Sequence, residues 1–448
     1  MLCRRMSDAT EHAAQLKALI HRRSARVGIV GLGYVGLPLA LAFANQGFRV
    51  VGFDIDEQRV QCLAAGRSYL SHVPPGPIQE AVARERLVAT SDMRRLREQQ
   101  ILLVCVPTPL LANREPDLRQ VRNAARAIAD HGHWGQLIVL ESTGYPGMTR
   151  EEFAPVLAEA GLQPAQQVFL ACSPEREDPG NARYPLVDIP KVVGADDPLS
   201  AELAKALYEQ VVAQVVEVSS TTAAEATKLT ENVYRAVNIA LSNELKLVFE
   251  QLGVDIWEVL DAAATKPFGF MRFDPGPGWG GHCIPVDPDY LRWKAQAQGV
   301  PTRFVDLAGE VNRAMPGHVV QRLQAALAQQ GKGLGGSCIL LLGLAYKRDV
   351  GDIRESPALA VWSQLGAAGA NVTYHDPWVP EFLGGARQRL PPQRSVPLTA
   401  EVLGAVDGVV LLTDHGQVDY QLVVDHAPLV VDCRGVYRAV RHNHVVRA

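Results

Sequence analysis

Two short segments of this 448-residue chain hold residue types that bind phosphates or form covalent intermediates. The first is the glycine turn GLGYVG from Gly31 to Gly36, which follows an apolar run and opens a helical pattern. Glycines at 31, 33 and 36 permit a tight turn and let backbone amides approach a pyrophosphate at a helix N-terminus. The alternative is a turn that binds no ligand.

Asp54 ends the next apolar run, 23 residues after Gly31. A carboxylate at this place can bond both ribose hydroxyls and repels a 2′-phosphate, which favours NAD over NADP. Arg59 qualifies this preference, because a nearby guanidinium can accommodate the phosphate. The pattern therefore predicts a dinucleotide site with NAD as cofactor.

The second segment is GGHCIPVDP, from Gly280 to Pro288. Its two glycines are expected to leave the Cys283 thiol open to a substrate, and Asp287 adds a nearby carboxylate. Lys228 and Asn232 stand four residues apart in a helical pattern, so their side chains share one face. A lysine and an amide can stabilise a developing oxyanion. The alternatives are a structural cysteine and a solvated helix face.

These residues need an α/β framework, and the apolar pattern supplies one. Strands are expected at Arg26–Val30, Arg49–Asp54, Ile101–Val106, Leu137–Glu141, Val168–Cys172 and Val192–Gly194, with a helix at Val35–Asn45. A second block begins near Gly336, with strands at Ser337–Gly343, Asn371–His375, Gly408–Thr413 and Leu429–Cys433 and a helix at Pro357–Leu365. Strands alternating with helices predict two Rossmann-like, doubly wound parallel-sheet domains, although the two blocks share no obvious sequence repeat.

The segment between the two blocks reads as helical. From Ala223 to Gly253 apolar residues recur at three- and four-residue steps without an internal proline or glycine, which predicts a long helix that joins domains or forms a dimer interface. Residues 265–290 then read as a Gly/Pro-rich loop. The predicted domains are an N-terminal extension at 1–24, an NAD-binding domain at 25–218, a central helical dimerisation domain at 219–330 and a C-terminal domain at 331–448.

Composition narrows the function classes. A net charge of −4 argues against nucleic-acid binding. Seven scattered cysteines without a CxxC pair predict neither a metal site nor a disulfide framework, and they favour the cytoplasm. The uncharged run Val27–Ala44 contains four glycines after its first residue and Pro38, which favours a soluble glycine turn over a membrane span. The segment Ala13–Ile20 is expected to form a short helix that docks weakly or frays.

Seven ordered segments carry a resemblance to the UDP-glucose/GDP-mannose dehydrogenase family along nearly the whole chain. They are GLGYVGLPLA from Gly31, CVPTP from Cys105, EST from Glu141, SPEREDPGNA from Ser173, EATKLTENVYRAVNIALSNEL from Glu225, PGPGWGGHCIPVDP from Pro275 and GLAYKRDVGDIRESP from Gly343. The GGHCIPVDP, REDPGN and KPFGFM segments are similar to the bacterial branch that oxidises UDP-N-acetylglucosamine at C6 for surface polysaccharides.

The resemblance implies a role for each matching position. Cys283 is expected to be the nucleophile, Glu175 the general acid/base, Lys228 and Asn232 the oxyanion donors, and Thr143 and Asp287 the groups that position water. The expected cofactor contacts are Gly31, Gly33, Tyr34, Val35, Gly36, Asp54, Arg59, Thr108, Thr143 and Arg354, and Arg354 is expected to reach the cofactor from a neighbouring subunit. The expected substrate contacts are Glu175, Arg176, Lys228, Asn232, Arg272, Gly280, Lys347 and Arg434, and the second α/β domain is expected to bind the nucleotide diphosphate.

Oxidation of an alcohol to an acid removes four electrons, whereas NAD accepts one hydride at a time. A thiolate at Cys283 can capture the intermediate aldehyde, and loss of a second hydride then gives a thioester. A carboxylate acting as general base helps water to hydrolyse it. Alternative substrates are UDP-glucose, UDP-N-acetylmannosamine and UDP-N-acetylgalactosamine. Alternative functions are a single-oxidation dehydrogenase, in which Cys283 would be incidental, and a nucleotide-sugar binder without activity.

Overall fold

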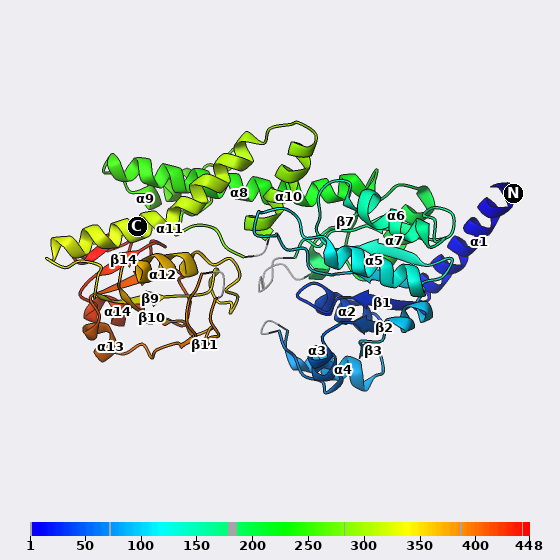
Figure 1. The fold of residues 1–448 in the computed structure, drawn as a ribbon, viewed down its shortest axis with the longest axis horizontal. Coiled ribbons are helices and arrows are strands. Elements are labelled where there is room, and N and C mark those ends of the chain that lie inside the picture. The colour runs from blue at the N-terminus through cyan, green and yellow to red at the C-terminus, as the bar shows by residue number, and fades with distance from the viewer. Residues whose placement is uncertain (1, 71–72, 178–185, 282, 386–387, 441) are drawn as a thin grey trace. The chain divides into compact units, whose positions relative to one another are not determined.

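The computed structural model describes residues 2–70, 73–177, 186–281, 283–385, 388–440 and 442–448 (Figure 1). Part of the SPEREDPGNA motif, and His282 of the GGHC segment, lie outside these ranges. The chain divides into two compact units. Unit 1 comprises residues 1–231 and 289–299, and unit 2 comprises residues 232–288 and 300–448.

Unit 1 is built on an eight-stranded sheet with the order β3-β2-β1-β4-β5-β6-β7-β8. Its neighbouring strands are parallel except β6 and β7. Short, mostly buried apolar strands of this kind require helices on both faces. The strands are β1 (Arg26–Val30), β2 (Arg49–Phe53), β3 (Leu87–Thr90), β4 (Ile101–Val104), β5 (Leu137–Leu140), β6 (Phe169–Cys172), β7 (Lys191–Ala195) and β8 (Val215–Val218).

The helices of unit 1 cover this sheet. They are α2 (Gly36–Asn45), α3 (Glu57–Ala64), α4 (Pro75–Ala83), α5 (Arg119–His131), α6 (Ala154–Glu159) and α7 (Pro198–Tyr208), with short turns η1 (Met93–Glu98), η2 (Thr149–Phe153) and η3 (Leu186–Asp188). Residues of α2, α4 and α7 pack in one apolar cluster with inward-facing residues of the central strands. The carboxyl ends of β1 and β4 lie side by side in this sheet, and this is where an open α/β sheet binds ligands.

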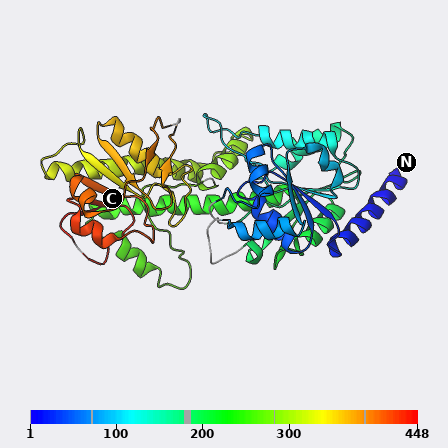
Figure 2. The same cartoon turned by 90° about the horizontal axis from the view of Figure 1, so that it is seen from below.

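The N-terminal helix α1 (Leu2–His21) is part of unit 1 and is drawn as the blue helix in Figure 2. Ala13, Leu16 and Ile20 are buried in the same core cluster, and α1 packs along α7. Lys17 forms an exposed ion pair with Glu202 of α7. The expectation of a short helix that docks weakly or frays was therefore wrong, because the three apolar residues form one stripe at helical spacing that the unit buries.

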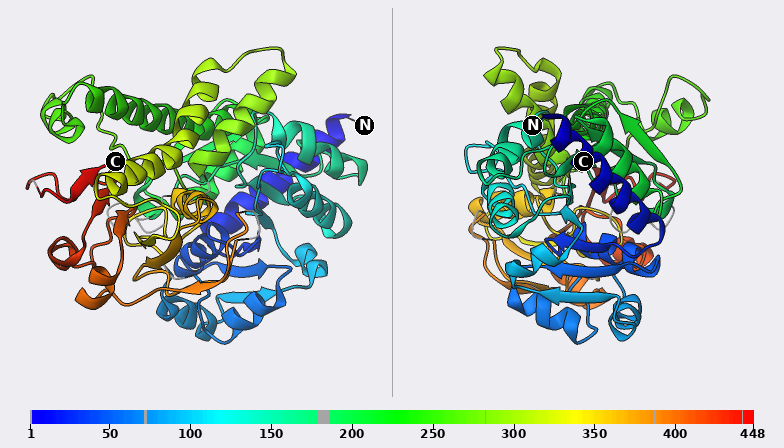
Figure 3. Two further views of the ribbon diagram at one scale, coloured as in Figure 1. Left: turned by 60° about the vertical axis from the view of Figure 1, so that its left-hand side comes forward. Right: turned by 90° about the vertical axis from the view of Figure 1, so that its right-hand side faces the viewer.

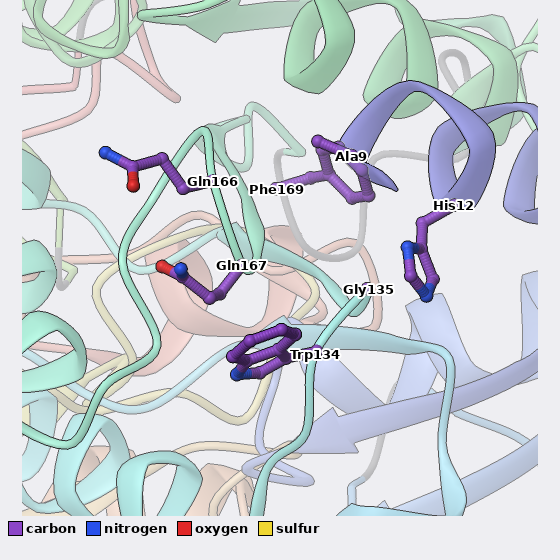
Figure 4. A pocket seen from close by; sticks show the side chains of 7 residues that line it. All are labelled: Ala9, His12, Trp134, Gly135, Gln166, Gln167 and Phe169. Atoms are coloured by element: carbon purple, nitrogen blue, oxygen red, sulfur yellow. The ribbon is translucent and has the colours of Figure 1, made fainter. Parts of the chain in front are cut away.

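Beside α1 the surface of unit 1 has a small pocket, shown in Figure 4. His12 of α1 faces Trp134 and Gly135, which precede β5, with Gln166 and Gln167 nearby. Its volume of about 20 Å³ is enough for roughly one water molecule. The pocket lies at the amino ends of β5 and β6, whereas open α/β sheets bind ligands at the carboxyl ends of their strands. It is therefore not a candidate substrate site.

Unit 2 contains a five-stranded parallel sheet with the order β10-β9-β13-β14-β15. One face packs against α11 (Arg303–Gln329) and α12 (Pro357–Ala367), and the other against α13 (Ala400–Ala405) and α14 (Tyr420–His426). The strands are β9 (Cys338–Leu342), β10 (Asn371–His375), β13 (Gly408–Leu411), β14 (Val430–Asp432) and β15 (Val445–Arg447), and β11 (Glu381–Phe382) pairs with β12 (Gln393–Arg394). The predicted pair of parallel-sheet blocks is thus confirmed.

Two helices contribute residues to both units. The long helix α8 (Thr221–Gln251) matches the prediction within two residues at each end. Helix α10 (Cys283–Ala297) begins inside the segment expected to be loop up to residue 290. That expectation was wrong because Pro285 lies in the first turn, where a missing N–H costs nothing, although Pro288 lies inside the helix.

Within unit 2, α8 packs against α11 through a polar contact, and both helices are visible in Figure 3 (green and yellow-green). The Asn243 amide donates to Asn312 Oδ1 over 2.8 Å, and both residues are buried. The short helix α9 (Ile256–Ala263) follows α8. No described helix has the combination of length and hydrophobicity that a bilayer-spanning segment requires; the Val27–Ala44 run folds as β1, the glycine turn and most of α2.

Candidate active site

The glycine turn after β1 has one position that the protein itself leaves open. Gly31 adopts a φ of 95°, and a Cβ there would lie 2.7 Å from the Cys105 carbonyl oxygen. A Cβ on Gly36 would lie 1.8 Å from the Gly31 carbonyl oxygen. A Cβ on Gly33 would meet no atom within 4 Å. Packing therefore requires the first and third glycines, whereas the second keeps clear a space that a pyrophosphate fits.

Asp54, the residue after β2, faces this turn. Its carboxylate accepts hydrogen bonds from the backbone N–H groups of Leu32, at 3.0 Å, and Asp56, at 3.0 Å. The Arg59 guanidinium lies 3.4 Å from Asp54 Oδ2 and over the ring of Tyr69. These contacts leave acceptor capacity on Asp54 for the hydroxyls of a ribose. The residues present therefore fit the adenosine half of NAD.

The remaining expected cofactor contacts of unit 1 lie on the turn and on neighbouring loops. Tyr34 and Val35 are half-buried in the glycine turn. Thr108 is buried in the loop after β4, and its carbonyl oxygen accepts a hydrogen bond from Tyr290 of α10 at 3.1 Å. Thr143 is half-buried in the loop after β5. These loops follow the carboxyl ends of β4 and β5, the edge of the sheet that also holds Gly31.

Glu175 lies in the loop after β6 and is buried. Its Oε1 accepts hydrogen bonds from the backbone N–H groups of Arg176 and Glu177, each at 2.7 Å, and its Oε2 accepts one from Lys191 at 2.9 Å. Lys228 of α8 donates to the Glu175 main-chain oxygen. Burial opposes ionisation of Glu175, but Lys191, Lys228 and the backbone donor Glu177 N–H outweigh it and lower the pKa of this carboxyl. Glu175 is therefore an ionised carboxylate at neutral pH.

Arg176, an expected substrate contact, is engaged within unit 1. Its guanidinium pairs with Glu231 of α8, with 3.1 Å between Nε and Oε2, and donates to the Pro190 carbonyl oxygen at 2.6 Å. These contacts fix the segment after Glu175 to α8. They give Arg176 a structural function, whether or not it also contacts a substrate.

The predicted nucleophile belongs to unit 2. Cys283 is the first residue of α10 and is partly exposed. One turn later on the same helix, the buried Asp287 accepts a 2.6 Å hydrogen bond from the Asn232 amide of α8. The structure thus brings Asn232 and Asp287 together within unit 2, and Glu175 and Lys228 together within unit 1. Lys228 and Asn232 are one turn apart on α8.

The glycines before Cys283 make room for the C-terminal block. A Cβ on Gly280 would lie 2.5 Å from Tyr346 Cβ, and one on Gly281, whose φ is 85°, would lie 2.9 Å from the Tyr346 ring. The Gly281 N–H donates to the Arg354 carbonyl oxygen at 3.0 Å. The Arg354 guanidinium pairs with Asp352, with 2.7 Å between Nη2 and Oδ2. The segment before Cys283 is therefore fastened to the loop that follows β9.

A basic cleft of about 410 Å³ opens in unit 2, around the loops after β9, β13 and β14. Arg348, Arg434 and Arg438 line it, together with Asp414 and Tyr420. Its three guanidinium groups suit an anion such as a diphosphate. Only Arg434 was singled out from the sequence; the signal for Arg348 and Arg438 was their position directly after Lys347 and four residues after Arg434.

Arg434 also links this cleft to the cysteine segment, residues 275–283, which ends at Cys283. Its Nε donates to the Leu412 carbonyl oxygen at 2.7 Å, and a Cβ on Gly276 would lie 2.8 Å from its Nη1. Lys347 is half-buried in the loop after β9. Arg272 pairs with Asp274 at 2.7 Å and with Asp261 of α9, and Asp261 also faces Arg438 at 3.9 Å.

The fold and these groups define a class of protein. One doubly wound unit carries a turn and an acidic residue suited to NAD, and a second carries a basic cleft fastened to a cysteine-bearing segment. This is the construction of a nucleotide-sugar dehydrogenase, in which the dinucleotide and the nucleotide-sugar each have a Rossmann-like domain.

Comparison with known proteins identifies the family. Three family models match in order: the NAD binding domain of the UDP-glucose/GDP-mannose dehydrogenase family at residues 25–212, its central domain at 222–314 and its UDP binding domain at 340–439. The chain belongs to this family. It is an NAD-dependent nucleotide-sugar 6-dehydrogenase, as the sequence motifs predicted.

Relatives within the family have different sugars in their names. The chain is 36% identical over 394 residues to UDP-N-acetyl-D-glucosamine 6-dehydrogenase of Pseudomonas aeruginosa, covering 88% of this chain and 91% of the relative. It is 36% identical over 434 residues to NDP-N-acetyl-D-galactosaminuronic acid dehydrogenase of Ralstonia nicotianae, covering 93% and 97%. The solved UDP-D-ManNAc dehydrogenase of Pyrococcus horikoshii superposes with a TM-score of 0.85 at 30% identity, covering 94% of this chain and 98% of that one.

Proposed function

We propose that this enzyme oxidises the C6 hydroxyl of a UDP-linked N-acetylhexosamine, UDP-N-acetylglucosamine before its epimers, to the carboxylate through a thioester on Cys283. The product would be a uronic acid precursor of a surface polysaccharide. Five cysteines, Cys62, Cys105, Cys172, Cys338 and Cys433, are free thiols, which suits the reducing cytoplasm as the place of action.

The observation that carries the proposal is the attachment of the cysteine segment to the basic cleft of unit 2. Gly276 abuts Arg434, which lines the cleft, and Gly281 is hydrogen bonded to the loop after β9. A nucleotide diphosphate held by the arginines would therefore present its sugar to Cys283. A binder without activity has no need of a thiol at this place.

The groups around Cys283 suit a thiolate. The first backbone N–H groups of α10 carry partial positive charge and favour an anionic sulfur. NAD, when bound, accepts the hydride that leaves C6 in each of the two oxidations. Between them the sulfur adds to the aldehyde carbon, which keeps the aldehyde bound. Asn232 and Lys228 are the donors proposed to stabilise the oxyanion that results.

Hydrolysis of the thioester needs a base and an aimed water molecule. Glu175 is ionised and held by three donors, so it can take a proton from water as that water attacks the acyl carbon. Asp287 is held by Asn232 and, with Thr143, is proposed to orient the water. The thiolate is the leaving group, and Cys283 is regenerated.

The Cys283 assignment is tested by the stoichiometry of NADH. The wild-type enzyme should release two NADH per sugar acid. Cys283→Ala should form no acid, although slow oxidation to the aldehyde can survive, because the first hydride transfer needs no thiol. Cys338→Ala, which removes an exposed thiol of β9, is the matched control and should leave both products unchanged. A normal rate of acid formation by Cys283→Ala would exclude covalent catalysis.

The Glu175 assignment predicts a stall at a later step. Glu175→Gln should complete both hydride transfers and then retain the sugar, so rapid mixing should show a burst of about two NADH per site. Acid release should fall roughly 10²- to 10⁴-fold, the usual contribution of a positioned general base. Intact mass spectrometry should find the adduct on the protein, and peptide mapping should assign it to the peptide containing Cys283. No burst and no adduct would assign Glu175 to substrate binding or an earlier step.

The sugar is tested by a panel of UDP-linked glucose, N-acetylglucosamine, N-acetylmannosamine and N-acetylgalactosamine. We expect the highest kcat/KM with UDP-N-acetylglucosamine. A higher kcat/KM with one of the other two N-acetylated sugars would correct the epimer and leave the chemistry in place. A preference for UDP-glucose would remove the acetamide from the proposal.

A dimer is proposed from the exposed face of α8. Tyr234, Leu241 and Val248 recur every seven residues and are about half exposed, which leaves an apolar stripe on one side of this helix. A second copy of the chain would bury it. Leu241→Glu should reduce the sedimentation coefficient to that of a monomer, whereas Leu383→Glu, at an exposed leucine after β11, should not. A wild-type monomer with full activity would refute the dimer and the cross-subunit function of Arg354.

A further inference from the structure

Behind Glu175, unit 1 buries a chain of charged groups that the reaction as described does not use. Lys191, the first residue of β7, donates to Glu175 Oε2 at 2.9 Å and to Glu141 Oε2 at 2.6 Å. Glu141 directly follows β5, and its Oε1 accepts a hydrogen bond from the Tyr208 hydroxyl at the end of α7. All four side chains are buried. Lys191 thus bridges the proposed base and a second carboxylate.

The charges in this cluster do not cancel in pairs. One ammonium faces two carboxylates, so its charge is shared between them. Burial alone would lower the pKa of Lys191, but the two carboxylates raise it, and Lys191 is therefore charged at neutral pH. Burial raises the pKa of Glu141 despite Lys191, whereas the pKa of Glu175 is lowered. The lysine thus holds Glu175 in its ionised form, and Glu141 limits how strongly it does so.

We propose that Lys191 is a positioning residue that aims and ionises Glu175, and that Glu141 tunes this effect by sharing the charge of Lys191. The proposal rests on the function of Glu175 as general base. When Glu175 takes a proton from water, the cluster changes from one net negative charge to none. Lys191 opposes that change and Glu141 favours it, so the two have opposite effects on the basicity of Glu175.

Other titratable groups also face the cluster. Lys228 of α8 acts on Glu175, and the buried thiol of Cys105, after β4, faces Glu141, Lys191 and Glu175. Cys172 of β6 lies near Glu141 and Lys191. Burial raises the pKa of both thiols well above the usual range, so they stay neutral at the pH of an assay. Lys191 and Lys228 are therefore the two lysines that act on Glu175: Lys191 donates to its carboxylate, and Lys228 donates to its main-chain oxygen.

The test is the pH dependence of thioester hydrolysis, measured in single turnover as acid formed after the second hydride transfer. The wild-type rate should be level between about pH 6 and 9, because Glu175 is ionised throughout. Lys191→Met removes the cation that bridges the two buried carboxylates, so their shared proton should make hydrolysis fall below about pH 7, with roughly a tenfold loss at pH 6. Glu141→Gln should keep a level profile with a rate lowered severalfold, because Glu175 becomes a weaker base.

The double variant Lys191→Met/Glu141→Gln separates charge from damage. It has the same net charge as the wild-type cluster, so it should fold even if Lys191→Met does not. Its hydrolysis should regain a level profile above about pH 6, because Glu175 no longer shares a proton. If the single substitutions instead acted by damaging the fold, their effects would add, and the double variant would be worse than either single variant. Lys205→Met, which removes an exposed lysine of α7, is the matched control and should behave as wild type.

Each outcome decides between the two proposals. A fall of hydrolysis at low pH in Lys191→Met that the double variant reverses supports the positioning function. Unchanged profiles in Lys191→Met and the double variant, with Glu175→Gln still stalled at the acyl-enzyme, would overturn the function of Lys191 alone. A Glu175→Gln variant that does not stall would overturn the general base itself. Loss of both hydride transfers in Lys191→Met and in the double variant would make Lys191 merely structural.

Discussion

The two units build the turn after the first strand of their sheets in the same way. Gly31 after β1 has a φ of 95°, and Gly343 after β9 has a φ of 90°. The Gly31 N–H donates to the carbonyl oxygen of Phe53 at 2.7 Å, and the Gly343 N–H to that of His375 at 2.9 Å. The sequences GLGYVG and GLAYKR therefore occupy equivalent turns, a repeat that was not evident from the sequence.

The carboxylates that face the two turns differ in how many hydrogen bonds they already accept from the protein. Asp54 accepts two backbone hydrogen bonds and lies 3.4 Å from Arg59. Asp376, in the equivalent place after β10, accepts five hydrogen bonds, from the N–H groups of Leu344, Ala345, Trp378 and Val379 and from His415 Nε2. The first can still bind a ribose, whereas the second is saturated by its own chain.

The third residue of the turn differs in the same direction. Gly33 faces open space, whereas its counterpart Ala345 fills that place with a buried methyl group. The same topology thus leaves acceptors and space for a ligand in unit 1, whereas in unit 2 the chain itself uses them. Unit 2 offers its arginines from beyond these first residues of the turn: Arg348 stands at the end of GLAYKR, and Arg434 and Arg438 follow β14.

The largest effect should come from Asp376→Asn. An amide cannot accept five hydrogen bonds, so buried donors lose their partners, at a cost of about 3 kcal/mol or more in the free energy of unfolding. Thermal and urea unfolding at pH 7 would measure this cost. Asp425→Asn, at an exposed aspartate of α14, is the control and should change stability little. A variant as stable as wild type would show that saturation of Asp376 does not stabilise the turn.

Asp54→Asn should instead change the cofactor and leave the fold intact. Removal of the charge that repels a 2′-phosphate should shift the ratio of kcat/KM for NAD to that for NADP by roughly 10²-fold towards NADP. The neighbouring Asp56, which caps α3, provides the control Asp56→Asn. A wild-type enzyme that uses NADP as efficiently as NAD would refute the function of Asp54. An Asp54→Asn variant that does not fold would show that Asp54, like Asp376, is needed for stability.

The N-terminal turn could be predicted because its signals are local. A strand, three glycines and an acidic residue after the next strand all lie within 30 residues, and each has one physical explanation. The long helix α8 was equally readable from its period. Helix boundaries were predicted wrongly where the local residue types gave conflicting signals. Helix α10 starts among prolines and glycines, and the apolar stripe of α1 lies among charged residues.

The buried cluster behind Glu175 could not be predicted, because its members are distant in the sequence. Lys191 begins an apolar strand, where a lysine reads as an exposed flank, and its partner Glu141 stands 50 positions earlier. The pairing arises only because β5, β6 and β7 are neighbours in the sheet. Likewise, the saturation of Asp376 depends on His415, which comes from the loop after β13.

Gly33→Ala would make the first turn resemble the second. The added methyl meets no protein atom within 4 Å, so the variant should fold with unchanged stability. It should weaken NAD binding about tenfold, because the methyl occupies the space proposed for the pyrophosphate. Isothermal titration with NAD measures the affinity. Gly36→Ala is the contrasting variant: its Cβ would clash with the Gly31 carbonyl oxygen, so it should lose stability first. Unchanged NAD affinity in Gly33→Ala would place the pyrophosphate elsewhere.

The smallest effect concerns His415, the partner of Asp376 that Asp54 lacks. His415 Nδ1 accepts a hydrogen bond from the Asp349 N–H at 3.0 Å, so the proton is on Nε2, which donates to Asp376 Oδ2 at 3.1 Å. Burial opposes ionisation of Asp376, but His415 and the backbone donors outweigh it and lower the pKa of this carboxyl. His415→Gln should therefore cost about 1 kcal/mol of unfolding free energy at pH 7.

The sign of the pH dependence follows from the lowered pKa of Asp376. A carboxyl whose pKa is lower in the folded protein stabilises it above its unfolded pKa of about 3.9 and loses that contribution as the pH falls through the folded pKa. The advantage of wild type over His415→Gln should thus be fully present at about pH 7 to 8 and smaller below about pH 4. Urea unfolding across this range measures it, with His426→Gln, at an exposed histidine of α14, as control. An advantage that instead grows below pH 4 would mean that His415 acts through its own charge and not by holding Asp376 ionised.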